Sequence, residues 1–450
     1  MMDALSFVKF SELQNWSVLY LTTKAIGYNR NYTLFPIGSF LHHSDDTVVI
    51  MDEEKYIQVT VHTNNGGIEA RDAIPKLGKD IGTKRQYRIH EGQFLMSKID
   101  ARNGAFGIVP SDLENAIVTQ DFPVFNVNNS KLNSEYLLLV TTTEHFKKVA
   151  QDCSSGTTNR QRIDIKKFLA QRIPLPLKSR QDEIVFKYKH AILEAQAKEV
   201  QAERLENEIE QYLMRELGTS VLKSAFNNRI NFVRFADAKR WDVPYFISST
   251  KAKSKYDTVS VANCLDYFME DMNGKTIRIE TAKFPDCDFH YLGMENVEKN
   301  TGELIELPVV KGAEVKSQTL LIPQSFLIYG KLRPYLNKYW LNDTELTDIV
   351  CSSEFFVFHV KPSINTLYFK YVLASSFVQQ QLADLSSGAR MPRINEKIFK
   401  NIQVPIPPID IQNSIVAHIA EMKAQIKLLK QQAAELRDKA LKDFENEIFE

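Results

Sequence analysis

One segment that occurs twice constrains the fold of this chain more than any other feature. Residues 154–185 read SSGTTNRQRIDIKKFLAQRIPLPLKSRQDEIV, and residues 386–416 read SSGARMPRINEKIFKNIQVPIPPIDIQNSIV. Both copies pass from Ser-Ser-Gly through Arg-Ile and a Pro-x-Pro to a glutamine that precedes a helical pattern. Because proline fixes φ and has no N–H to donate, each Pro-x-Pro predicts an extended connector before a helix.

A heptad pattern follows each connector. Apolar residues alternate at spacings of four and three, as in the seam of a coiled coil, and only Lys198 is out of character. Arg393 follows Arg162 by 231 residues, a whole number of heptads, so both helices keep the same face toward a partner. We therefore predict that the two helices pack on each other. The predicted seam comprises Ile184, Tyr188, Ala191, Ala195, Lys198, Ala202, Leu205 and Ile209, and Ile415, Ile419, Met422, Ile426, Leu429, Ala433, Leu436 and Ala440.

The regions between the helices echo one another at low identity. Lys98-Ile99 returns as Lys331-Leu332, and Trp16 returns as Trp241. A chain of 450 residues exceeds one ordinary domain, and the repeat favours two matched halves. The predicted fold class is α+β: two tandem mixed α/β domains, and two long helices that form an antiparallel coiled coil about a pseudo-twofold axis. The predicted boundaries are 1–153 and 227–385 for the globular domains, and 154–226 and 386–450 for the connectors with their helices.

Short β-rich runs characterise the first globular region. TVVI at 47–50 and YIQVTV at 56–61 precede Asn-Asn-Gly-Gly at 64–67, a turn signal that predicts a hairpin or tight loop. Residues 91–110 predict a buried strand that leads into a glycine-containing polar loop. Residues 131–150 are expected to be helical.

Composition leaves the class of partner open. The formal net charge is zero, so only local clustering argues for a polyanionic partner. Four cysteines lie far apart without metal-ligand spacing, which predicts reduced thiols, no metal site and a cytoplasmic location. The N-terminus has no signal-peptide pattern, and no apolar run approaches a membrane span.

Basic and amide side chains gather at matched places in the two halves. Arginine and lysine contact phosphates and guanine edges, and asparagine reads adenine in the major groove. For each loop residue taken alone, turn chemistry with solvated charge is an equally good interpretation; the two loops together favour DNA. Trp16 and Trp241 are interpreted as core aromatics. The predicted DNA-binding residues are Lys98, Arg102, Asn103, Arg160 and Arg162, and Lys331, Arg333, Asn337, Arg390 and Arg393.

The paired connectors and helices, together with EGQFLMSKIDARNGAFGIVP and SFLIYGKLRPYL, resemble the specificity subunit of type I restriction-modification enzymes over essentially the whole chain. The resemblance implies two target recognition domains, each reading one half of a bipartite site in double-stranded DNA. It also implies docking of two methyltransferase (modification) subunits and of restriction/translocase subunits. The chain itself would be non-catalytic and without a cofactor, because S-adenosylmethionine, ATP and Mg belong to the partner subunits.

Motifs of the partner activities are missing from the sequence. IPPID at 406–410 lacks the amide and the aromatic residue of an adenine-methyltransferase motif, and no phosphate-binding loop is present. Asp286 with Glu314-x-Lys316 is a formal match to a nuclease metal site, but so short a pattern favours coincidence. The alternatives are a coiled-coil adaptor that binds proteins, which neutral charge slightly favours, and, more weakly, a nuclease built from duplicated units.

The second helix is expected to span roughly 50 Å at about 1.5 Å per residue, compared with about 34 Å for one turn of B-DNA. Two reading domains at opposite ends of such helices would contact one duplex more than one turn apart.

Overall fold

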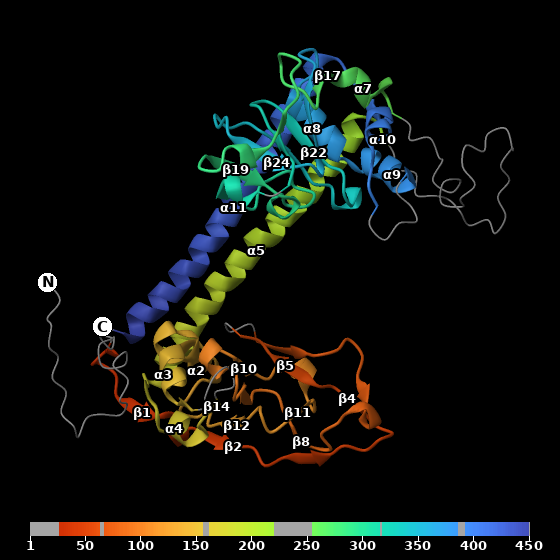
Figure 1. The fold of residues 1–450 in the computed structure, drawn as a ribbon. Helices are drawn as coiled ribbons and strands as arrows, with labels where there is room; N and C mark the ends of the chain where they lie inside the picture. The colour runs from red at the N-terminus through yellow and green to blue at the C-terminus, as the bar shows by residue number, and fades with distance from the viewer. Residues whose placement is uncertain are drawn as a thin grey trace. The chain divides into compact units, whose positions relative to one another are not determined.

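The computed structural model describes residues 27–63, 67–155, 162–219, 254–315, 317–385 and 392–449. Arg160, Arg390 and both tryptophans singled out above lie outside these ranges. The chain divides into unit 1, residues 1–198 with 431–450, and unit 2, residues 199–430. Both long helices contribute to both units (Figure 1).

An antiparallel sheet forms the centre of unit 1, in the order β10-β9-β12-β2. Its strands β9 and β10 are buried except at Ile108, and its core contains Phe94, Phe106 and Phe125, none of which is exposed to solvent. The sheet and its covering helices are β2 (Leu41–His43), β9 (Phe94–Met96), β10 (Phe106–Ile108), β12 (Val124–Val127), α2 (Ser134–Thr142) and α3 (Glu144–Asp152).

A second sheet and a hairpin complete the globular part of unit 1. The hairpin predicted from the Asn-Asn-Gly-Gly signal is confirmed, because β5 pairs with β6 on either side of it with Val61 opposite Ile68. These elements are β3 (Thr47–Val49), β8 (Arg85–Arg88) and β11 (Ile117–Val118), ordered β11-β8-β3, with the pairs β5 (Val59–Val61) and β6 (Ile68–Ala70), and β4 (Lys55–Tyr56) and β7 (Lys76–Leu77).

The helix expected over 131–150 is interrupted. Thr143 has extended backbone angles, and its hydroxyl accepts a hydrogen bond from Phe146 N, so it ends α2 and caps α3. Three successive β-branched threonines favour such a break, because their hydroxyls bond backbone carbonyls one turn back.

Unit 2 repeats this topology. Its first sheet has the order β23-β22-β25-β17, and its second extends the three-strand arrangement to β18-β21-β24-β19-β20. Strand β19 runs parallel to β24, as Gln58 bridges Ile117 in parallel in unit 1. The strands are β17 (Leu265–Phe268), β18 (Arg278–Ile279), β19 (Asp288–Leu292), β20 (Val309–Lys311), β21 (Thr319–Leu321), β22 (Leu327–Gly330), β23 (Tyr339–Leu341), β24 (Ile349–Ser352) and β25 (Phe355–Val360), and the helices are α7 (Val261–Cys264), α8 (Thr366–Ala374) and α9 (Ser376–Leu385).

Both connectors are extended at the Pro-x-Pro, as expected from proline chemistry. Buried Gln181 accepts a hydrogen bond from Asn133 N and donates to Pro176 O; buried Gln412 accepts from Asn365 N in the same way. The repeated glutamine therefore joins each helix start to its unit. The connector elements are β13 (Ser154–Ser155), β14 (Arg162–Ile163), α4 (Ile165–Ala170) and β15 (Arg172–Pro174), which pairs with β1 (Leu34–Pro36), and α10 (Glu396–Asn401) and β26 (Gln403–Pro405), which pairs with β16 (Thr258–Ser260).

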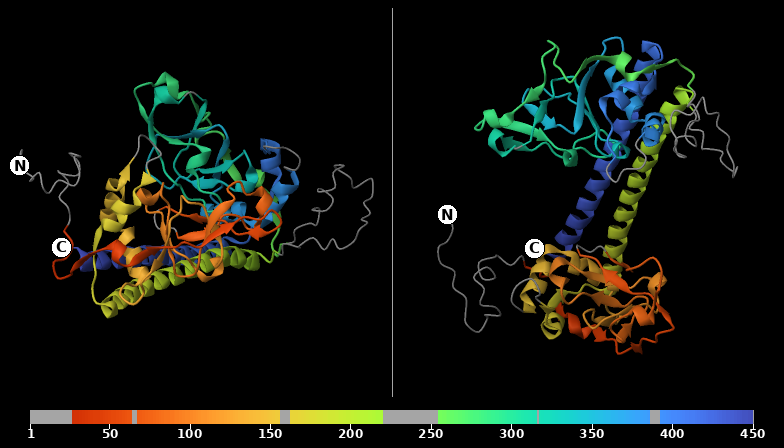
Figure 2. Two further views of the ribbon diagram at one scale, coloured as in Figure 1. Left: turned by 90° about the horizontal axis from the view of Figure 1, so that it is seen from below. Right: turned by 45° about the vertical axis from the view of Figure 1, so that its right-hand side comes forward.

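The long helices α5 (Lys178–Glu216) and α11 (Ile409–Ile448) run side by side and antiparallel within each unit (Figure 2). In unit 1, Arg180 contacts Glu447, and Lys198 donates to Gln432 Oε1 at 2.9 Å. The seam lysine that breaks the heptad pattern thus has a polar partner across the helix pair. None of the described helices is both long and apolar enough to span a membrane.

Unit 2 shows the same helix pairing, through a Glu206–Lys430 ion pair and the contact of the Tyr212 and His418 rings, which are tilted by 46° to each other. The predicted seam is on the packed side of both helices. Ile184, Ile415, Ile419, Met422 and Ile426 are buried, and Tyr188, Leu205, Ile209, Leu429 and Leu436 are half-buried.

Candidate nucleic-acid interface

The first predicted DNA-binding cluster forms where strand β9 ends in unit 1. Lys98 N donates to Asp121 O at 2.8 Å, and Ile163 N donates to Lys98 O at 2.9 Å. The connector therefore lies along the strand end, which brings Arg162 to Asp121, with 3.2 Å between Arg162 Nη2 and the carboxylate. Three segments that are far apart in the sequence meet here.

The same cluster recurs in unit 2. Lys331 N donates to Glu354 O at 2.7 Å, and Ile394 N donates to Lys331 O at 3.0 Å. Arg393 donates from Nε and Nη2 to the two oxygens of Glu354, at 3.1 and 2.9 Å. Each unit thus places one connector arginine beside an acid at an equivalent strand end.

Both arginines remain accessible although they are paired. The side chains of Arg162 and Arg393 are 59% and 60% exposed. The Glu354 carboxylate raises the pKa of Arg393, which fixes its positive charge. A carboxylate occupies one edge of the guanidinium, so N–H groups on the other edge are free to donate to a phosphate oxygen.

The two lysines of the clusters are less available than the arginines. Lys331 Nζ donates to Ser353 O at 2.7 Å and lies 4.8 Å from the ring centroid of Phe356. Partial burial of the Lys331 side chain lowers the pKa of Lys331. Lys98 is half-buried at the equivalent position.

Asn337 is predicted from the sequence to contact a base, but in the structure it has a structural role instead. Its side chain is buried, its amide donates to Ala374 O at 2.7 Å, and its Oδ1 accepts from Gln379 Nε2 at 2.8 Å. These bonds hold a residue with φ of +46°, a left-handed conformation in which asparagine is among the better-tolerated residues. Arg333 has φ of +49° and is half-buried, with a buried Nε that has no partner in the part of the chain that the structure describes.

The strand register changes which loop residues are equivalent. Strands β9 and β22 pair with β10 and β23 in matching registers, with Met96 opposite Phe106 and Tyr329 opposite Tyr339. Aligning these pairs places Tyr335 at the position of Arg102, and Asn337 at that of Gly104. Arg102 is half-buried and Asn103 exposed.

Tyr335 is a candidate that sequence reasoning missed. Its side chain is 58% exposed. The left-handed glycine at 104, matched by an asparagine at 337, was the signal in the sequence that could have aligned the two turns correctly.

The described residues contain no group of three or more His, Cys, Asp or Glu side chains placed to hold a metal ion. Of the formal nuclease match, Lys316 lies outside the described residues.

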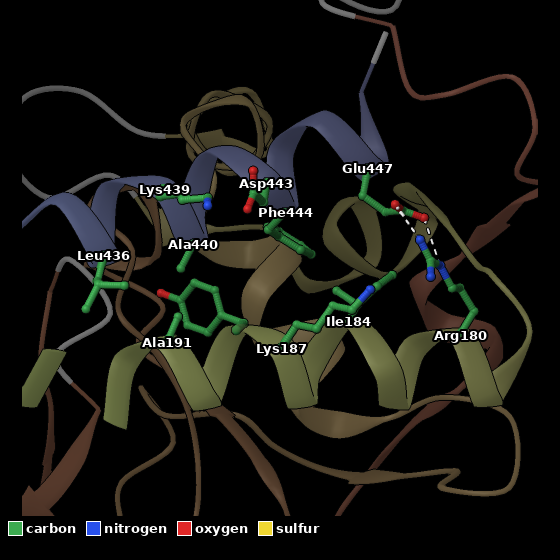
Figure 3. A pocket seen from close by; sticks show the side chains of 11 residues that line it. Arg180, Ile184, Lys187, Ala191, Leu436, Lys439, Ala440, Asp443, Phe444 and Glu447 are labelled. Carbon is green, nitrogen blue, oxygen red and sulfur yellow. Dashed lines mark hydrogen bonds and ion pairs between the residues drawn. The ribbon is translucent and has the colours of Figure 1, made fainter. Parts of the chain in front are cut away.

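A cavity of about 390 Å³ lies between α5 and α11 in unit 1 (Figure 3). Its walls include the seam residues Tyr188, Ala191 and Ala440 together with Phe444, and the charged side chains of Lys187, Lys439 and Asp443. At one end Arg180 and Glu447 form a bidentate ion pair, and this pair lowers the pKa of Glu447. The cavity thus combines an apolar part, between facing seam residues, with a charged rim, and it lies where small seam residues leave a gap between the two helices.

Comparisons with known proteins agree with the duplication. The model of the "type I restriction modification DNA specificity domain" matches residues 44–211 and again 269–438. The type I restriction enzyme EcoDI specificity subunit of Escherichia coli is 26% identical over 142 residues, which are 32% of this chain and 31% of that protein. The HindI specificity subunit of Haemophilus influenzae is 33% identical over 100 residues, 21% of this chain and 22% of that protein.

These sequence matches thus span about a third and about a fifth of the two curated relatives. One solved structure comes from work on complex assembly and conformational transition of the type I R-M system. It covers 93% of this chain and 97% of its own, with 13% identity and a TM-score of 0.54, a likeness of fold.

Proposed function

Because this chain belongs to the type I restriction modification DNA specificity family, we propose that it is the DNA-recognising, non-catalytic subunit of a type I restriction-modification complex. Each unit would read one half of a bipartite site in double-stranded DNA. The two half-sites would then direct methylation of adenine by partner subunits.

The observation that carries this proposal is the repeated arginine–acid cluster. Arg162 with Asp121 and Arg393 with Glu354 occupy equivalent strand ends in two units whose strand topology is otherwise shared. Phosphate contacts position a protein on a duplex, whereas base contacts supply specificity. An accessible, oriented arginine beside an exposed loop would provide both kinds of contact in each unit.

Partners and cofactors follow as part of the same proposal. The exposed faces of α5 and α11 would dock two methyltransferase subunits, and restriction/translocase subunits would join for cleavage. S-adenosylmethionine, ATP and Mg would be bound by those subunits, and this chain would need no cofactor of its own.

The proposal is tested by mapping adenine methylation in genomic DNA. The chain is co-expressed with the modification subunit from its own source, and the control omits the chain. A split motif with methyl-adenine in both halves, present only with this chain, is the expected result. No methylation change from a soluble, assembled complex would favour a protein-binding adaptor instead.

A further inference from the structure

The turn at residues 333–337 of unit 2 displays an aromatic residue from a rigid base. Arg333 and Asn337, at its two ends, both have left-handed backbone angles; asparagine tolerates this conformation, whereas an arginine adopts it only when its surroundings support it. Pro334 between them is buried. The intervening Tyr335 is 58% exposed.

Several hydrogen bonds fix this turn to the rest of unit 2. Arg333 N donates to Pro392 O at 2.8 Å, and Asn300 N donates to Asn337 O at 3.1 Å. The buried Asn337 amide adds its bonds to Ala374 and Gln379. The turn is therefore pre-organised, so little conformational entropy is lost when Tyr335 contacts a ligand.

Tyr335 also lies next to the arginine–acid cluster. Leu332 forms a β-bridge with Arg393, and the turn begins at the following residue. Tyr329, Tyr339 and Trp340, on the two strands that flank the turn, are 5% exposed or less. Tyr335 therefore presents its ring to solvent from a turn whose neighbouring aromatic residues are part of the core.

The equivalent position of unit 1 has different chemistry. There Arg102 stands in place of Tyr335, on a turn (Ala101–Asn103) that ends in left-handed Gly104. A shared backbone thus carries a cationic side chain in one unit and an aromatic one in the other. Such a difference at equivalent positions is expected where two units read different base sequences.

Resting on the proposed function, we infer that Tyr335 is a specificity-determining residue whose ring contacts base edges of the half-site read by unit 2. The aromatic ring supplies apolar contact to a base edge, including the thymine methyl group. Arg102 has the equivalent role in unit 1.

The test uses the complex of this chain with its modification subunits and a library of randomised DNA duplexes. Base preference at each motif position is read by sequencing the methylated duplexes. In Tyr335→Ala, discrimination at one or two adjacent positions of a single half-site should fall about fivefold, as expected for the loss of one modest base contact. Arg102→Ala should relax only the other half-site.

Phe35→Ala provides the matched control, because Phe35 is an exposed aromatic, 39% accessible, on β1 outside both loops and both long helices. It should leave the base preferences of both half-sites unchanged. Unchanged preference in Tyr335→Ala, or equal relaxation of both half-sites, would overturn the inference while the proposed function stands. A wild-type complex that selects no split motif would overturn both.

Discussion

Two arginines, one in each unit, show most clearly how local chemistry prepares this surface. Arg162 and Arg393 are each directed by an acid that lies just before a strand: Asp121 is three residues before β12, and Glu354 is one residue before β25. The acids reduce the local positive charge but limit the rotamers of the arginines. Specific placement on DNA requires hydrogen-bond donors that are held in a fixed orientation, and diffuse positive charge does not provide them.

This interpretation predicts the salt dependence of DNA binding. Each phosphate contact changes the slope of log K against log salt by about 0.9 in B-DNA. Arg393→Gln should reduce the slope by about 1, and the double variant with Arg162→Gln by about 2, in fluorescence anisotropy titrations from about 50 to 300 mM salt. Arg204, exposed on α5, provides the control Arg204→Gln, which should keep the wild-type slope. Loss of affinity with an unchanged slope would assign the arginines a purely structural role.

His90 predicts a pH dependence confined to unit 1. Its ring nitrogens lie 2.6 Å from Glu114 Oε1 and 2.8 Å from Asp46 Oδ2, and these hydrogen bonds raise the pKa of His90 in the folded state. Because the pKa of His90 is higher in the folded than in the unfolded state, protonated His90 stabilises unit 1 fully below the unfolded-state pKa of about 6.5. This stabilisation is lost as the pH rises through the folded-state pKa.

In urea unfolding, His90→Gln should therefore destabilise unit 1 at pH 6 and differ less from wild type as the pH approaches 9. His42→Gln, at an exposed position, serves as the control. A penalty in His90→Gln that is equal at both pH values would contradict the charged-imidazole interpretation.

At the scale of elements, the helix pairs of the two units differ in residue size at matched seam positions. Ala191 and Ala440 line the cavity in unit 1, whereas the residues 231 positions away, Met422 and Ile209, are larger and lie on the packed side of the helices in unit 2. The cavity therefore lies where unit 1 has two small seam residues.

Filling the gap should stabilise unit 1. Ala191→Met with Ala440→Ile is expected to raise the free energy of unfolding by about 1 kcal/mol, as typical cavity-filling changes do. The reverse change, Met422→Ala at a buried position, should lower stability by about 2 to 5 kcal/mol. Urea midpoints of the three proteins measure both effects. Destabilisation by the filling pair would mean that unit 1 cannot accept the side chains of the other seam.

The elements that depend on the periodicity of apolar residues and on proline chemistry could be predicted from the sequence. The heptads at Ile415–Ile426 and the Pro-x-Pro connectors required only local rules. Matching arginine with arginine and asparagine with asparagine misaligns the turn after β22, because it ignores backbone conformation. Asn337 matches Gly104 through left-handed φ, a conformation that glycine and asparagine both tolerate.

At the scale of the whole molecule, helix length is proposed to set the spacing of the half-sites. Removing 195–201 from α5 and 429–435 from α11 deletes one heptad from each helix at paired positions. At about 1.5 Å per residue this shortens the pair by about 10 Å, equivalent to about three base pairs. Methylation mapping should show a correspondingly shorter spacer between unchanged half-sites. A spacer of the original length would rule out the helices as its determinant.

The duplication itself was readable in the sequence because the connectors and helices kept their residues. The globular units kept only their topology, so individual contacts such as the Arg393–Glu354 pair required the structure.

The central claim is that the two units read separate halves of one site. It is tested most directly by exchanging residues 230–385 for the corresponding region of another family member and mapping adenine methylation with the modification subunit present. The predicted result is a new motif in which one half-site changes and the other is retained. A motif altered in both halves would contradict independent reading by the two units.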